Sequence, residues 1–229
     1  MELLVEGVRQ ALRLLITADA EVLRITLLSL QVSLSAVAAS LVAGIPLGTA
    51  LALARFPGRS FVVSLVNTGM GLPPVVVGLF VSILLWRSGP LGALELLYTP
   101  TAIVLAQFVI ALPIVTGLTM AAVQQIPAEF RLQMLGLGAS RVQLLVVLLR
   151  EARLPMLAAL MAGFGAVISE VGASMMVGGN IRGQTRVLTT ATVLETSKGS
   201  FDIAIALSLL LLLITFLVNW ALTWIQQRR

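Results

Sequence analysis

Long apolar stretches separated by short polar ones run along most of the chain. A helix of about 20 apolar residues crosses the ~30 Å hydrocarbon layer of a membrane. Runs such as residues 207–213 lack the alternation of a membrane β-barrel strand. We therefore predict a single all-α, polytopic membrane domain over residues 1–229, with about five transmembrane helices. The predicted spans are residues 22–54, 61–86, 101–124, a fourth from 154 into the polar stretch 169–180, and 201–225.

Glycines and prolines interrupt several of these spans. The first contains Gly44-Ile45-Pro46, the second Gly71-Leu72-Pro73-Pro74, and the third Pro113. An interior proline costs ~3 kcal/mol in a soluble helix. Membrane helices tolerate it where a neighbour or a water-lined cavity satisfies the freed backbone groups. We predict that the first span is broken at residues 44–46 and that the broken segments line a pathway. Kinking that serves only packing is the alternative.

The N-terminal residues 1–20 carry charges between leucines. Glu2, Glu6, Arg9, Arg13 and Asp19 leave no uninterrupted apolar core of a signal peptide. The pattern predicts an amphipathic helix lying at the membrane interface.

Composition supports a membrane protein and narrows its chemistry. Hydrophobic residues make up 59% and charged residues 11% of the chain, whereas a soluble domain is about half apolar and a quarter charged. The absence of Cys and His excludes thiol nucleophiles, disulfides and metal sites built on imidazole or thiolate. No Gly-x-x-x-x-Gly-Lys-Ser/Thr loop occurs. We therefore expect no cofactor and no ATP hydrolysis on this chain.

The basic residues indicate a topology rather than a nucleic-acid partner. Eight arginines fall on one side of the predicted spans and six basic residues on the other. Because basic residues accumulate in cytoplasmic loops, we predict an N-terminus outside and a C-terminus in the cytoplasm. The first group is Arg55, Arg59, Arg131, Arg141, Arg150, Arg153, Arg228 and Arg229; the second is Arg9, Arg13, Arg87, Arg182, Arg186 and Lys198.

A polar interruption at residues 124–153 separates the third span from the fourth. Pro127 suits the opening of a short helix over residues 128–135. Gly138 allows a tight turn, and residues 144–149 form a second apolar patch. A solvated helix-turn-helix with an apolar face suits docking into a groove of another protein.

The turn of this interruption resembles a known coupling loop. Leu137-Gly138-Ala139-Ser140, a hydrophobic helix and then Leu154-Pro155 are similar to the cytoplasmic coupling loop of binding-protein-dependent ABC importer permeases. The Glu-Ala-Ala triplet of that loop is replaced here by Leu132, Gln133 and Met134, one helical turn after Glu129. The resemblance implies that Glu129, Gly138, Ala139 and Ser140 contact a separate ATP-binding subunit.

A second set of residues extends the resemblance over most of the chain. Residues 168–173, 175–181 and 185–190, with Leu72-Pro73-Pro74-Val75-Val76-Val77-Gly78, resemble permeases of the tungstate, molybdate and sulfate group, tungstate-type permeases most closely. The resemblance implies a lipid-embedded homodimer in the inner membrane that translocates an oxyanion by alternating access. It also implies two partners, an ATPase and an extracytoplasmic solute-binding protein. A permease for sulfate or an amino acid, an intramembrane enzyme and a passive channel are the alternatives.

The same stretch supplies candidate residues for the pathway. Glu170 lies ~24 Å beyond Leu154 along a helix that rises 1.5 Å per residue, and an ionisable group within a membrane is costly. A carboxylate would repel an oxyanion, so we expect Glu170 to be a structural partner of Arg182 or Arg186. Backbone N–H groups and threonine hydroxyls could pass the anion along weakly. The predicted translocation path or gate comprises Ser169, Glu170, Gly178, Gly179, Asn180, Thr189 and Thr190.

Overall fold

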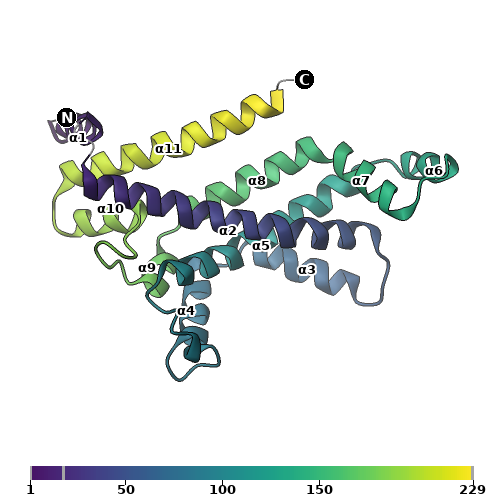
Figure 1. The fold of residues 1–229 in the computed structure, drawn as a ribbon, viewed down its shortest axis with the longest axis horizontal. Coiled ribbons are helices and arrows are strands. Elements are labelled where there is room, and N and C mark those ends of the chain that lie inside the picture. The colour runs from purple at the N-terminus through teal and green to yellow at the C-terminus, as the bar shows by residue number, and fades with distance from the viewer. Residues whose placement is uncertain (1, 17–18, 228–229) are drawn as a thin grey trace.

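The computed structural model of the protein describes residues 2–16 and 19–227, and helices form nearly all of this part of the chain (Figure 1). Residues 17 and 18 of the predicted amphipathic segment, and the terminal Arg228 and Arg229, lie outside it. The described residues contain no strand, which confirms the all-α prediction. The helices are α1 (Glu2–Ile16), α2 (Ala20–Leu53), α3 (Arg59–Met70), α4 (Pro74–Leu85), the 3₁₀ turn η1 (Gly92–Leu94), α5 (Pro100–Gln124), α6 (Ala128–Gly136), α7 (Arg141–Glu151), α8 (Arg153–Ile168), α9 (Gly172–Gly178), α10 (Leu188–Ser197) and α11 (Phe201–Gln227).

Three helices, α2, α5 and α11, are each long and apolar enough to cross a membrane. Two helix pairs pass the same test together but are bent, α3 with α4 by 103° and α8 with α9 by 58°. The described chain therefore holds three membrane-spanning candidates, or five if each bent pair is one span. The upper count equals the number of spans predicted from the sequence.

Helix α2 packs along α5 and runs through Pro46 without interruption, so the predicted break at residues 44–46 is wrong. The glycines beside this proline serve close packing instead. A Cβ atom on Gly48 would lie 2.4 Å from the carbonyl oxygen of Thr116, and one on Gly44 would lie 2.8 Å from Val115. Helix α5 likewise continues through Pro113.

The chain does break at the second of these interruptions, and it also breaks where the fourth predicted span enters its polar stretch. Pro74 begins α4 just after the Gly71-Leu72-Pro73 turn, where a proline needs no hydrogen-bond donor. Residues 169–171 separate α8 from α9.

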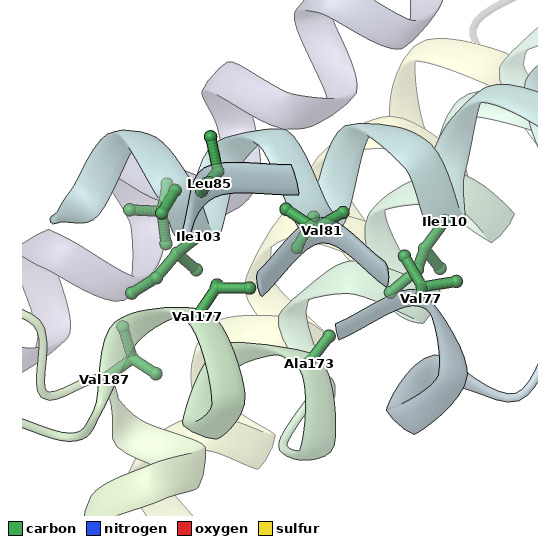
Figure 2. Close-up of a cluster of buried hydrophobic side chains, with 11 residues drawn as sticks. Val77, Val81, Leu85, Ile103, Ile110, Ala173, Val177 and Val187 are labelled. Atoms are coloured by element: carbon green, nitrogen blue, oxygen red, sulfur yellow. The ribbon is translucent and has the colours of Figure 1, made fainter. Parts of the chain in front are cut away.

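A buried cluster fixes α9 against α4 and α5 (Figure 2). Its side chains are almost completely excluded from solvent, and Gly78 allows α4 to approach the backbone of Ala173. The short helix α9 is therefore part of the packed interior. The residues labelled in Figure 2 are Val77, Val81, Leu85, Ile103, Ile110, Ala173, Val177 and Val187.

The N-terminal helix α1 packs against α11, where Gly7 leaves room for Ile205. Helix formation in this segment agrees with the prediction, although α1 ends at Ile16. Asp19 belongs to the next element, because its carboxylate accepts the N–H groups of Glu21 and Val22 at the start of α2.

Candidate functional site

Two candidate sites lie at opposite ends of the molecule (Figure 1). The helical hairpin of α6 and α7 projects at one end, and the α9–α10 segment lies near the start of α2 at the other. Helix α5 ends at Gln124 and α8 begins at Arg153. The predicted interruption of residues 124–153 therefore coincides with the hairpin, and its helix-turn-helix form is confirmed.

The turn of the hairpin depends on glycine and serine chemistry. Gly138 has φ +82°, a conformation that glycine adopts without steric cost, and a Cβ atom at this position would meet no heavy atom within 4 Å. Ser140 begins α7 with a capping box: its hydroxyl accepts the N–H of Gln143 at 3.3 Å, and its own N–H donates to the Gln143 side chain at 2.8 Å. Ala139 donates its N–H to the carbonyl of Met134. These contacts define how the two short helices are joined.

One face of the hairpin is anchored to the long helices. Val123, Ile126, Leu148 and Ala152 form a buried cluster between the hairpin and the adjoining ends of α5 and α8. Arg131 reaches back from α6 and donates to the carbonyl of Val123 at 2.9 Å. The hairpin is thus held in one orientation relative to the spans.

The opposite face of the hairpin is apolar and uncovered. Leu132 is 68% exposed, Leu137 80% and Val142 70%. Glu129 lies exposed in the first turn of α6. This combination of a fixed base and an uncovered apolar face suits binding of a protein partner.

At the other end, Glu170 is buried and bound to backbone. Its side chain accepts the N–H of Ala173 at 2.8 Å, in the first turn of α9, while Thr189 donates its hydroxyl to the Glu170 carbonyl at 2.9 Å. A structural role for Glu170 fits this geometry, but the predicted pairing with Arg182 or Arg186 is wrong. Both arginines lie in the loop after α9 and reach α2 instead, where they pair with Glu21.

The glycine-rich segment after α9 has an unusual backbone. Gly179 has φ +70° and faces the ring of Tyr98, which would lie 2.8 Å from a Cβ atom there. Asn180 has φ +52°, and its side chain donates to the carbonyl of Thr190 and accepts from Arg186, both at 3.3 Å. The Gly178 carbonyl accepts the buried hydroxyl of Thr185. These contacts with Tyr98, Thr185, Arg186 and Thr190 therefore hold the backbone of residues 178–180 in one conformation.

The structure brings most, but not all, of the predicted pathway residues together. Thr189 adjoins Glu170, and Asn180 adjoins Thr190, whose own hydroxyl donates to the carbonyl of Val187 at 3.0 Å. Both threonines are buried. Ser169 is exposed and bonds only within its own helix end, to the carbonyls of Gly165 and Ala166.

Glu21 is a functional candidate that the sequence did not reveal as a partner of the arginines. Its carboxylate accepts from Arg182 through two nitrogens, one at 2.8 Å, and lies 3.5 Å from Arg186. The hydrogen bond that Arg182 donates to the Glu21 carboxylate raises the pKa of Arg182 above its ordinary value. The two sides of this ion pair stand 161 residues apart along the chain, and no local pattern links them.

Metal chemistry has no clustered ligands in the described residues. None of them form a group of three or more His, Cys, Asp or Glu side chains able to hold a metal ion.

The apolar helices, the two bent helix pairs and the projecting hairpin indicate a multi-pass membrane protein that binds a partner. Residues 44–229 match the family of binding-protein-dependent transport system inner membrane components, and the chain belongs to that family. It is therefore a multi-pass inner-membrane permease, which confirms the resemblance seen in the sequence. Membership implies a solute-binding protein and an ATPase as partners.

Individual relatives carry more specific names. A probable anion ABC transporter permease protein of Haloferax volcanii is 44% identical over 85% of this chain and 86% of the relative. The tungstate uptake system permease protein TupB of Peptoclostridium acidaminophilum is 39% identical over 99% of this chain and 100% of the relative. TupB of Campylobacter jejuni is 36% identical over 96% of this chain and 92% of the relative.

Proposed function

We propose that this chain is the membrane-spanning subunit of an ABC importer that translocates an oxyanion, tungstate foremost or molybdate, with ATP hydrolysis on a separate subunit. The observation that carries the proposal is the 39% identity to a tungstate uptake permease over 99% of the chain. Molybdenum and sulfate permeases of Escherichia coli are 29% and 31% identical over shorter stretches. Sulfate is therefore the second candidate substrate.

The surface of α3 supports a homodimer. This helix buries no residue within the chain, and Ser64, Asn67 and Thr68 lie exposed among its apolar neighbours. Polar side chains within a membrane face a protein interior or a water-filled cavity, because contact with lipid is costly. A second copy of the chain across a water-filled path would provide that cavity for alternating access, while the apolar side chains of α4 and α11 contact lipid.

The charge distribution supports an outside N-terminus and a cytoplasmic C-terminus. At the end that carries the hairpin, six described arginines stand against two carboxylates, Glu129 and Glu151. Basic residues gather on the cytoplasmic side, so the hairpin end would face the cytoplasm. The arginines are Arg55, Arg59, Arg131, Arg141, Arg150 and Arg153.

The hairpin would transmit ATP hydrolysis to the spans. Its anchored face is continuous with α5 and α8, and its apolar face is free to enter a groove on the ATPase. Within this proposal Glu129, Gly138, Ala139 and Ser140 lie at or beside the docking surface, and residues 124–153 form the coupling unit of a single domain spanning 1–229.

The α9–α10 segment would form the outer part of the path and its gate. Ser169, Glu170, Gly178, Gly179, Asn180, Thr189 and Thr190 all belong to it. Because the hydroxyls of Thr189 and Thr190 donate to carbonyls in this conformation, direct contact with an anion requires these hydrogen bonds to open. This conformation would therefore be the closed form of the gate.

Uptake by the complete complex in proteoliposomes tests the proposal. Permease, ATPase and binding protein should accumulate tungstate and molybdate when ATP is supplied on the cytoplasmic side. ATP-driven uptake of sulfate or an amino acid, without uptake of tungstate or molybdate, would reject the proposed substrate in favour of the solute taken up. Equilibration of solute without ATP would indicate a channel.

Labelling from one side of the membrane tests the topology. The chain has no native cysteine, so Ser140→Cys in the hairpin and Ser197→Cys at the end of α10 can be compared directly, both positions being exposed. An impermeant maleimide added outside should modify only the second. Modification of both from outside would reject the arrangement.

A further inference from the structure

Three arginines and the carboxylate of Glu21 line one hollow at the start of α2. Arg182 and Arg186 both contact Glu21. The third, Arg24, lies one turn further along α2. Its Nη1 atom is 3.5 Å from the point where a Cβ atom added to Gly183 would lie. Two segments distant in the sequence, α2 and the loop after α9, thus bring three arginines near one carboxylate.

These groups line a hollow with an excess of positive charge. A cavity of about 240 Å³ is bounded by Ala20, Glu21, Arg24, Arg182, Gly183 and Arg186 among others. Three positive charges against one negative leave a net charge of +2 in its lining. Among the residues that the structure describes, Arg24 makes no ion pair.

A neighbouring hollow shares part of this lining but has a different charge. This second cavity, of about 400 Å³, shares Glu21, Arg182 and Arg186 and is also lined by Asp19, Glu195 and Lys198. Lys198 and Glu195 pair at 2.7 Å, and Asp19 adds a further carboxylate. The excess of positive charge is therefore concentrated in the smaller hollow.

The arginines already show the chemistry that an oxyanion needs. Arg182 donates two nitrogens of its guanidinium fork to the two oxygens of Glu21, and such forks match carboxylate and tetrahedral oxyanion geometry equally well. Arg182 is largely exposed, whereas the Arg186 side chain is only 15% exposed. An incoming dianion can therefore reach the cluster from solvent and exchange with Glu21.

We propose that Arg24, Arg182 and Arg186 form a weak receiving site for a free tetrahedral oxyanion at the outer mouth, with Glu21 as the competing carboxylate. This inference rests on the proposed oxyanion transport. The site also contacts the proposed gate, because Arg186 donates to Asn180. An oxyanion that draws Arg186 away from Asn180 would loosen the segment that closes the path.

Protection of a single cysteine measures binding separately from transport. Gln184 is exposed and lines the same cavity, so Gln184→Cys places a thiol beside the arginines. Tungstate should slow its reaction with an uncharged, polar maleimide in the assembled complex, whereas chloride at equal ionic strength should not. Transport by the Gln184→Cys complex is the control that the substitution leaves the permease folded.

Substitutions of the lining separate specific binding from general charge. Arg24→Gln should raise the half-protecting tungstate concentration about tenfold, because one of three cations around a dianion is lost in a partly screened setting. Arg24→Lys should restore most of the protection. Glu21→Gln should lower that concentration, because it removes the competitor. Arg87→Gln, which removes an exposed cation outside this cavity, is the matched control and should change nothing.

The contrary outcomes are distinct from one another. ATP-driven tungstate uptake without tungstate protection, or equal effects of Arg24→Gln and Arg87→Gln, would overturn the receiving site alone. Protection by anionic lipid in nanodiscs, with no response to tungstate, would assign the cluster to lipid phosphate and also overturn it. Tungstate protection without ATP-driven uptake would keep the site and overturn the proposed function.

Discussion

Replacing Glu170 distinguishes a backbone cap from an ion-pair partner. The carboxylate is 7% exposed and accepts the N–H of Ala173, a residue with no exposed surface. Glu170→Ala removes the acceptor and leaves that N–H buried, whereas Glu170→Gln keeps an acceptor oxygen and removes only the charge. The two variants should therefore differ strongly.

The structure sets the size of the difference. A buried donor left without a partner costs about 1–3 kcal/mol, so Glu170→Ala should lose about that much unfolding free energy. In Glu170→Gln the remaining hydrogen bond is about half as strong as a charge-assisted one. Relief from burying an ionised group offsets part of that loss. We expect Glu170→Gln to stay within about 1 kcal/mol of the parent.

Unfolding of the purified permease in nanodiscs, followed by tryptophan fluorescence, measures both variants. The Glu21→Gln variant is measured beside them as the loss of a true ion-pair partner, because Glu21 and not Glu170 pairs with the arginines. Equal destabilisation by Glu170→Gln and Glu170→Ala would refute the cap, because it would show that the charge itself is required.

Three further predictions concern the turn, the helix packing and the gate. Gly138→Ala should weaken association of the permease with the ATPase up to about tenfold, because a left-handed residue other than glycine costs ~1–2 kcal/mol. The control Gly136→Ala, in equally open space, should leave this affinity unchanged. Equal affinities of the two variants in a titration with the ATPase would contradict the prediction. Gly48→Ala should lower the unfolding free energy by about 1–3 kcal/mol through overpacking against the α5 backbone, with Gly165→Ala as the control in open space. Asn180→Gly, which tolerates φ +52°, should retain more tungstate uptake than Asn180→Ala, and the reverse order would show that the backbone conformation is unimportant.

The hairpin could be predicted from the sequence because its signals are local. Polar residues interrupt the apolar pattern at Gln124, a proline opens the first helix, and Gly138 allows the turn. The structure ends α5 and begins α8 at the two predicted limits. The motifs around this turn and after Glu170 also identified the family correctly.

The partners of the charged residues could not be predicted in the same way. The sequence predicts that Glu170 holds an arginine, because an ionised group in a membrane needs a partner. In the structure a backbone N–H at a helix start, that of Ala173, is the partner instead. The arginines pair with Glu21 across 161 residues, a contact that depends on how α2 lies beside the α9–α10 loop. Pro46 shows the same limit, because α2 stays continuous where its glycine face fits closely against α5.

The contacts of the α9–α10 segment also determine the order in which a gate would open. Arg182 with Glu21 is an exposed pair, and solvent screens such pairs so that they contribute little to stability. The hydroxyl of Thr185 is buried and bridges the Gly178 carbonyl and the Ile181 N–H. Breaking this bridge would leave buried polar groups without a hydrogen-bond partner, at a cost of about 1–3 kcal/mol. The contact between Arg182 and Glu21 should therefore open first, with Gly179 and Gly183, both at positive φ, as the flexible points on either side of it. An oxyanion bound at the proposed receiving site would act on this weaker contact, so its arrival at the outer mouth would begin to open the path.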